Sequence, residues 1–405
     1  MHIDESCCFI NYREAYRAGS PQCISILALA ATFNGHQPDS TSYSNTNTYQ
    51  SNVISPSKTN IFLIGATGYI GGSVLTRLLN HASANTFDIT VLVRSAEKAK
   101  VLQEKFDIKA VVGSNDDLDK LEALSEQSHV VFSCADAGNL AAIQVILHSL
   151  KKRHTSTGDL SILIHTSGTA VIATQAKGMF SSVTIYSDTD VDQVKSIPPT
   201  APHKDVDLAV IAADEEGYAR TYTILPSTIY GQAKGPLFDA GISNSTSIQI
   251  PYLIRAALGR KQGGVVGQGK AIWLDVHIDD VLDLYIVLLD AITANQAGVG
   301  HGWEGIYFGK NGEHTWYDIS KAISKVLVEL GVGGTDEPTS FADEELAKYW
   351  GSVDVGNFDG MNARCRANRG RSIGWKPKYT TADMLASIKP EVALLWEKAQ
   401  KEGGV

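Results

Sequence analysis

The sequence has few cysteines, no long apolar run and no excess of positive charge. Its 405 residues include only five cysteines. Their spacing matches neither a disulfide framework nor a metal-binding motif, so we expect a reducing compartment and no metal. No run is long and apolar enough to span a bilayer, which argues against a membrane partner. The net charge of −9 disfavours a general nucleic-acid binder. These absences predict a cytoplasmic protein.

The remaining composition suits a large folded domain with a smaller accessory lobe. Hydrophobic residues make up 43% of the chain, enough for a sizeable core. Residues 1–57 differ, because positions 37–57 are rich in Ser, Thr and Asn and lack apolar periodicity. We therefore expect a disordered N-terminal leader. Its apolar stretch at 23–31 faintly resembles a signal peptide, but nearby acidic residues oppose that interpretation.

A glycine-rich turn between a predicted strand and a predicted helix is the most informative motif. The apolar run 60–64 leads into this turn, and apolar residues then recur at helical spacing as far as Leu79. In dinucleotide sites, such glycines let the main chain approach a pyrophosphate, and the helix N-terminus binds its oxygens. We therefore expect cofactor contacts from the residues of the turn: Gly65, Thr67, Gly68, Tyr69, Ile70 and Gly71.

The residues after the second predicted strand indicate which dinucleotide binds. This strand covers 88–93 and is followed by Arg94 and Ser95. Sites selective for NAD place a carboxylate there to bind the ribose 2′-hydroxyl. A guanidinium instead binds a 2′-phosphate by two parallel hydrogen bonds. Arg94 and Ser95 therefore predict NADP(H) in preference to NAD(H), with a solvated helix-opening arginine as the alternative.

Apolar strands alternate with helical segments along the chain. Further strands are predicted at 110–113, 129–135, 161–167 and 221–226. Such alternation predicts a Rossmann-type α/β fold, a doubly wound parallel sheet covered by helices on both faces. We expect the nucleotide-binding domain to cover 58–235. A smaller mixed α/β substrate lobe should cover 236–405, interleaved with late elements of the sheet.

Four separated segments resemble the short-chain dehydrogenase/reductase superfamily, in its extended or atypical branch. They are the GxxGxxG spacing at 65–71, Pro226–Gly231, Trp273–Val281 and Gly374–Pro377. The third of these closely matches a segment typical of nucleotide-sugar epimerases. The resemblance also implies cofactor contacts beyond the turn, from residues at the ends of later strands: Asn115, Cys134, Ala135, Thr166, Pro226 and Ile229. Asp279 or Asp280 is expected to cap the following helix rather than to act in catalysis.

The catalytic pair of that superfamily is missing at its expected place. Its enzymes use a Ser or Thr after the fifth strand with Tyr-x-x-x-Lys on the next helix, where the lysine lowers the pKa of the phenol. Ser167 and Thr169 supply the hydroxyl candidates, but the helix reads PHKDVDLA from 202 to 209. Literal matches at 230–234 and 317–321 fall in unsuitable parts of the chain and are interpreted as chance.

Three interpretations of this departure stay open. In the first, His203 replaces the phenol as acid and base, with Lys204 or Asp207 nearby. In the second, Tyr186 reaches the pocket from the insertion before the helix. A helix-capping histidine and a surface tyrosine are the structural alternatives. In the third, there is no hydride chemistry, and the protein binds NADP(H) and reports its level to a partner.

The leading expectation is an NADP(H)-dependent oxidoreductase that acts on a small carbonyl or alcohol. A non-catalytic NADP(H)-binding regulator is the alternative, because fold alone does not confer activity. A nucleotide-sugar epimerase or dehydratase comes third, since epimerases also need the missing pair. Homodimer formation is left open.

Overall fold

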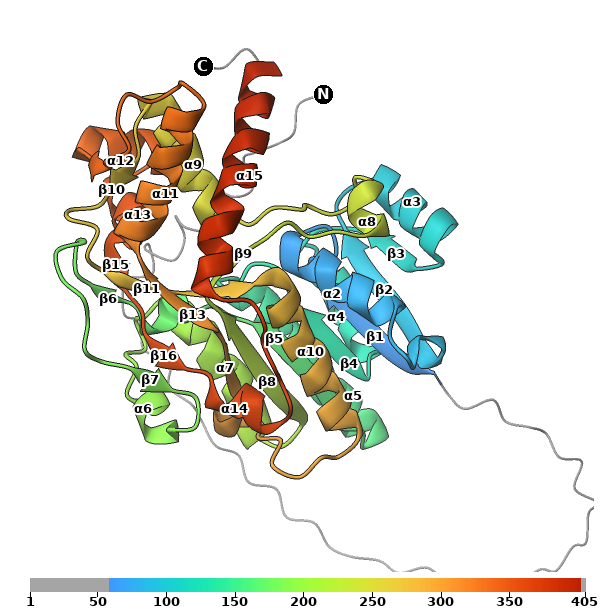
Figure 1. Cartoon of the computed structure of the whole chain (residues 1–405). Coiled ribbons are helices and arrows are strands. Elements are labelled where there is room, and N and C mark those ends of the chain that lie inside the picture. Colours follow the sequence, from blue (N-terminus) through green and yellow to red (C-terminus); the bar gives the residue numbers. More distant parts are fainter. Residues whose placement is uncertain (1–57, 402–405) are drawn as a thin grey trace, which may run out of the picture.

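Seven parallel strands form the centre of the molecule, in the order β12-β8-β5-β4-β1-β2-β3 (Figure 1). The computed structural model describes residues 58–401, so the expected leader at 1–57 lies outside the described residues. In chain order, the strands are β1 (Thr59–Ile64), β2 (Phe87–Val93), β3 (Lys109–Val112), β4 (Val130–Ser133), β5 (Ser161–Thr166), β8 (Ala219–Pro226) and β12 (Ile306–Gly309). Their order and direction confirm the predicted Rossmann-type fold.

Helices cover both faces of this sheet, as its apolar strands require. Strand β1 shows why, because Phe62 and Leu63 point to opposite faces and both are fully buried. One face is covered by α2 (Tyr69–Leu79), α3 (Ala96–Phe106) and α10 (Ile278–Thr293). The other is covered by α4 (Leu118–Glu126), α5 (Leu140–Thr157) and α7 (Lys204–Glu215). Both α10 and β12 come from the C-terminal half, so that half contributes a strand and a covering helix to the main sheet.

A second lobe is built around a three-stranded sheet. Its strands are β9 (Thr228–Tyr230), β11 (Ile272–His277) and β13 (Gly312–Thr315), with β11 in the middle. Four helices accompany it: α9 (Gln249–Arg260), α11 (Trp316–Glu329), α12 (Asp343–Trp350) and α15 (Thr381–Lys401). Helix α15 packs against both α9 and α11. No described helix is both long and apolar enough to cross a membrane.

The insertion between β5 and α7 is tied to the C-terminal segment by two short strand pairs. Strand β6 (Thr174–Gln175) pairs with β15 (Met361–Asn362), and β7 (Tyr186–Ser187) pairs with β16 (Cys365–Arg366). The remaining short elements are η1 (Ala84–Thr86), η2 (Thr169–Ile172), α6 (Val191–Lys195), α8 (Pro236–Asp239), β10 (Gly264–Val265), η3 (Gly302–Gly305), β14 (Thr339–Ser340), α13 (Val353–Gly356), η4 (Asn357–Gly360) and α14 (Asn368–Ser372).

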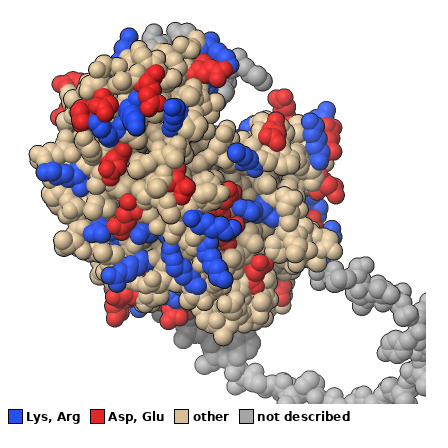
Figure 2. All heavy atoms as spheres, viewed as in Figure 1, with Lys and Arg blue, Asp and Glu red and all other residues tan. Residues whose placement is uncertain are grey.

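Charged side chains of both signs are spread over the surface. Lys and Arg lie among Asp and Glu over most of the face seen in Figure 2. A face of mixed charge does not produce the strong single-signed potential that attracts a polyanion.

Candidate functional site

The glycine turn joins β1 to α2 at the carboxyl edge of the sheet, and two of its positions accept only glycine. Gly65 has φ +92°, and a Cβ there would lie 2.7 Å from the Cys134 carbonyl oxygen. A Cβ on Gly71 would lie 2.2 Å from the Gly65 carbonyl oxygen. Gly68, the N-cap of α2, makes no side-chain capping bond. The turn therefore has the close-fitting main chain and open helix N-terminus that a pyrophosphate needs.

A long loop from the second lobe lies against this turn. We call residues 231–248, which connect β9 to α9 and contain α8, the strap. The Ser243 hydroxyl donates to the Ala66 carbonyl at 2.8 Å, and the Asn244 N–H donates to the Thr67 carbonyl at 3.0 Å. The Tyr69 hydroxyl donates to the Gly231 carbonyl at the start of the strap. Figure 1 shows α8 beside α3, well away from β9.

Positive charge gathers where β2 ends and α3 begins. Arg94 is exposed, and the Ser95 hydroxyl caps α3 by accepting from the Lys98 N–H at 3.2 Å. The Lys98 ammonium donates to the Ile242 carbonyl of the strap at 2.7 Å. Burial, followed by the charge of Arg94, lowers the pKa of Lys98. The predicted residues Arg94 and Ser95 thus lie together, and Lys98 links them to the strap.

Thr166 ends β5 and takes part in a buried hydrogen bond that sequence reasoning missed. Its hydroxyl lies 2.7 Å from the hydroxyl of Tyr285 on α10, and both side chains are buried. Burial raises the pKa of Tyr285 and raises that of Cys134 to about 12. Both groups therefore stay protonated at neutral pH, and the Cys134 thiol is no nucleophile. No local signal pointed to Tyr285, which is 119 residues away from Thr166.

The catalytic candidates meet where β5 ends and α7 begins. Ser167 continues β5, because its N–H donates to the Ile224 carbonyl at 2.9 Å. His203 precedes α7 with φ +64°, and its ring lies 4.0 Å from the position of a Cβ on Gly168. Asp207 and Lys204, on the first turn of α7, are both 2% exposed. The structure therefore brings Ser167, His203, Lys204 and Asp207 together.

Burial controls the protonation of this cluster. It lowers the pKa of His203, so the imidazole is neutral at pH 7. It raises the pKa of Asp207 to about 7, against the lowering effects of Ser167 and Lys204. Burial also lowers the pKa of Lys204, whose ammonium donates to the Val194 carbonyl at 3.3 Å. The site thus combines a neutral base with a carboxyl group that still holds a proton part of the time.

Tyr186 and Thr169 occupy other positions. Tyr186 lies on β7 opposite Cys365, and its N–H donates to the Arg364 carbonyl. Thr169 is 2% exposed and begins η2. The main chain of Tyr186 is thus paired with the C-terminal segment, whereas the His203 ring lies beside Gly168.

The other predicted positions are distributed along the same edge. Pro226 ends β8, and Ile229 lies on β9, which pairs with β11. The chance matches are engaged elsewhere: Tyr230 donates to the Thr380 carbonyl, and Tyr317 donates to Glu337. Within residues 58–401 no group of His, Cys, Asp and Glu side chains could hold a metal ion.

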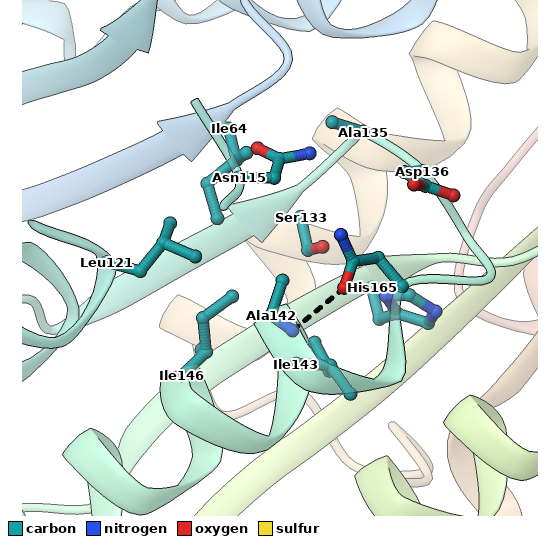
Figure 3. Close-up of a pocket in the computed structure, with 11 residues that line it drawn as sticks. Ile64, Asn115, Leu121, Ser133, Ala135, Asp136, Ala142, Ile143, Ile146 and His165 are labelled. Carbon is teal, nitrogen blue, oxygen red and sulfur yellow. Dashed lines mark hydrogen bonds between the residues drawn. The ribbon is translucent and has the colours of Figure 1, made fainter. Parts of the chain in front are cut away.

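A small cavity lies between α5 and the carboxyl ends of β1, β4 and β5 (Figure 3). Leu121 and Ile146 lie on one side of it, and Asp136 and His165 lie on the other. Asn139 also lines it and caps α5 by accepting from the Ala142 N–H at 2.9 Å. The predicted residues Asn115 and Ala135 belong to its lining, so they lie near each other at the carboxyl edge of the sheet.

Known proteins share both the sequence pattern and the fold. Residues 61–299, more than half of the chain, match the NAD-dependent epimerase/dehydratase family. The oxidase ucsJ of an Acremonium species is 28% identical over 333 residues, covering 78% of this chain and 92% of that protein. An uncharacterized Schizosaccharomyces pombe protein is 24% identical over 342 residues, covering 79% and 96%.

Solved structures agree in fold. The UDP-glucuronic acid 4-epimerase of Bacillus cereus, in complex with UDP-glucuronic acid and NAD, matches with a TM-score of 0.57 at 14% identity, covering 83% of this chain and 100% of that one. The UDP-glucose 4-epimerase of Thermotoga maritima, with UDP-glucose, has a TM-score of 0.56 at 16% identity, covering 84% and 99%. The family match, the glycine turn and the sheet order together show that this chain belongs to the NAD-dependent epimerase/dehydratase family.

Proposed function

We propose that the protein is an NADP(H)-dependent oxidoreductase acting on a small carbonyl or alcohol, with His203 as its acid and base. One observation carries this proposal. The His203 ring lies beside Gly168, the residue that follows Ser167, at the start of the helix on which the resembled superfamily carries its tyrosine. An imidazole can exchange a proton near neutral pH, as the phenol does in those enzymes.

The glycine turn and the end of β2 support the choice of cofactor. A Cβ on Gly65 or Gly71 would collide with a main-chain carbonyl oxygen, so only glycine permits this tight turn. Such a turn lets the main chain approach a bound pyrophosphate closely. Arg94, Ser95 and Lys98 supply a guanidinium, a hydroxyl and an ammonium where a 2′-phosphate would lie. When bound, the nicotinamide supplies or accepts a hydride.

The side chains of the cluster then have separate tasks. Neutral His203 accepts the proton of an alcohol during oxidation, and the protonated ring returns one during carbonyl reduction. The Ser167 hydroxyl orients the substrate oxygen by a hydrogen bond. The naming of one relative as an oxidase supports oxidation as the working direction.

The test combines cofactor titration with variants of the site. NADPH and NADH are titrated against residues 58–405 by tryptophan fluorescence, and NADP⁺ turnover is then screened with small alcohols. His203→Ala should lower turnover by about 10²–10⁴-fold and leave NADPH affinity nearly unchanged, because the ring acts only on the substrate proton. For wild type, kcat/KM should fall on acidification only below about pH 6.5, since burial lowers the pKa of His203 below that ordinary value.

His148, an exposed histidine on α5, provides the matched control. His148→Ala should change neither turnover nor affinity. Unchanged turnover in His203→Ala would eliminate His203 as acid and base. Absence of binding by either nucleotide would remove the cofactor assignment altogether.

The strap supports a second candidate, a protein that reports NADP(H) without turnover. The strap contacts the glycine turn through Ser243 and Asn244, and it leads into α9 of the second lobe. A bound dinucleotide could therefore alter the surface of that lobe. This candidate requires different affinities for NADPH and NADP⁺ together with a partner that senses the difference, and a partner insensitive to the cofactor would contradict it.

A further inference from the structure

Buried polar atoms without hydrogen-bond partners concentrate behind the catalytic candidates. Among the described residues, the buried polar atoms that lack such a partner include both ring nitrogens of His165, Nδ1 of His203, Oδ1 of Asp207 and Oγ of Ser167. Leaving a buried polar atom unpaired is unfavourable, because the atom loses its hydrogen bonds to water and gains none in the protein. Native proteins tolerate few of them, and perturbed polar groups gather preferentially at functional sites. His165 is therefore a group in need of an explanation, since the proposed reaction does not use it directly.

His165 and Asp207 lie side by side beneath Ser167. His165 on β5 is 1% exposed, and its Nε2 lies 4.0 Å from Oδ1 of Asp207 on α7. This separation is too long for a hydrogen bond, so a proton can pass between them only when the two side chains approach each other. Hydrogen bonds of a catalytic site are often long until substrate binds. The two side chains are thus placed to exchange a proton.

The cavity connects His165 with the surface. Its polar lining consists of Asn115, Ser133, Asp136, Asn139 and His165. Asp136 and Asn139 are half-buried, whereas His165 lies at the inner end. Figure 3 shows Asp136 on the same side of the cavity as His165. The space open to water is about 10 Å³, which is room for about one water molecule beside polar partners.

We propose that Ser167, Asp207 and His165 form a buried proton relay between the substrate site and this cavity. The proposal rests on the proposed oxidoreductase function. In alcohol oxidation the C–H bond gives up a hydride to the cofactor, and the O–H bond gives up its proton to His203. The relay carries that proton through the Ser167 hydroxyl, the Asp207 carboxyl and the His165 ring to water, which leaves His203 neutral for the next turnover. Carbonyl reduction runs the same path inward.

Protonation states suit such a path. Burial lowers the pKa of His165 to about 3, with a further contribution from His203, and it raises the pKa of Asp207 to about 7. Both groups are therefore largely neutral in mildly acidic solution. A neutral imidazole accepts a proton at one nitrogen and releases one from the other. The charged groups facing the pair are Lys204, which lowers the pKa of Asp207, and Asp205, which raises it.

The buried pair is tested first through stability, independently of turnover. The pKa of His165 is higher in the unfolded chain than in the fold, so protons favour the unfolded state below about pH 6.5. The contribution of neutral His165 to folding stability is therefore lost as the pH falls from about 6.5 towards 3. Asp207 has the opposite sign, because its folded pKa is raised, so its contribution is lost as the pH rises from about 4 to 7. Each group changes the unfolding equilibrium constant by up to about tenfold per pH unit, and in wild type the two effects oppose each other.

Relative to wild type, the two single variants should change the dependence of folding stability on pH in opposite directions. His165→Gln leaves the contribution of Asp207, so stability should fall as the pH rises from 4 to 7. Asp207→Asn leaves that of His165, so stability should rise with pH over 4–6.5. Both slopes are measured by urea unfolding at several pH values. Parallel slopes in the two variants would overturn the pair, whatever the turnover.

The relay itself is tested by turnover of the same variants. His165→Gln should lower kcat at least tenfold, raise the solvent deuterium isotope effect, and leave KM and NADPH affinity unchanged. His314 supplies a matched control, because it is a buried histidine whose Nδ1 lies 3.2 Å from Asp275 in the second lobe. His314→Gln should keep kcat and the isotope effect. An unchanged kcat in His165→Gln would overturn the relay and leave the oxidoreductase proposal standing. Absence of turnover in wild type would overturn that proposal and, with it, the relay.

Discussion

Three polar side chains lie together at the end of β2, where the proposed NADP(H) would place its 2′-phosphate. The Lys98 ammonium already donates to the Ile242 carbonyl of the strap, and the Ser95 hydroxyl caps α3. Arg94 is exposed at the same edge, and its guanidinium can bind a doubly charged phosphate by two parallel hydrogen bonds, which neither a hydroxyl nor an ammonium can match. Discrimination between the two dinucleotides should therefore depend mainly on Arg94.

Arg94→Ala should weaken NADPH binding and leave NADH binding unchanged. The expected loss is about 1–3 kcal/mol, the range for a hydrogen bond to a charged group. Fluorescence titration of both nucleotides gives the comparison, and Arg366→Ala, at an exposed arginine on β16, is the control. Equal losses for NADPH and NADH would contradict a specific role for Arg94.

Helix α10 shows how one element is held by a distant segment. The sequence predicted Asp279 or Asp280 as its cap, but His277 performs that role by accepting from the Asp279 N–H at 3.2 Å. Asp280 instead accepts from the N–H groups of Lys378 and Tyr379, each at 2.9 Å. The prediction failed because these donors lie almost one hundred residues further along the chain. Asp280 therefore anchors the chain before α15 to α10.

Asp280→Ala should destabilise the protein strongly. Two lost hydrogen bonds to a buried carboxylate correspond to about 3–5 kcal/mol in the free energy of unfolding. Asp279→Ala is the neighbouring control. That side chain is half exposed, and its ion pair with Arg77 is expected to contribute only about 0–1 kcal/mol. Urea unfolding measures both, and similar losses in the two variants would refute the anchoring role.

The whole molecule is interleaved rather than built from consecutive pieces. Strand β12 adds to the edge of the main sheet beside β8, and α10 covers the face that carries α2. Asp188 of the insertion accepts from the N–H groups of Phe308, Asn368 and Arg369. The main sheet and its helical layers therefore include residues from both halves of the chain.

A fragment of residues 58–235 should fail to fold cooperatively. It lacks α10 and β12, so the apolar face beneath α10 and the edge of β8 would both be exposed. Thermal unfolding followed by circular dichroism should show no sharp transition for the fragment and a single one for residues 58–405. A cooperative transition in the fragment would contradict this dependence.

Patterns that lie close together in the chain were predictable. The strand, glycine turn and helix at 60–79 follow from local periodicity and from the backbone needs of Gly65 and Gly71. The parallel sheet follows from the alternation of apolar strands with helices. Arg94 and Ser95 follow from their place directly after β2. Contacts between distant segments were not predictable, among them the strap on the glycine turn and the hydroxyl of Tyr285 beside Thr166.

The sequence by itself determined the sheet, the cofactor turn and the absence of the usual tyrosine–lysine pair at the start of α7, because each depends on neighbouring residues. Only the tertiary structure decided which side chains share the site. It placed Tyr186 on β7 and left His203 beside Gly168, and it buried His165 against Asp207. The reason is physical: burial and long-range proximity set the protonation of these groups, and neither is encoded in the spacing of residues along the chain.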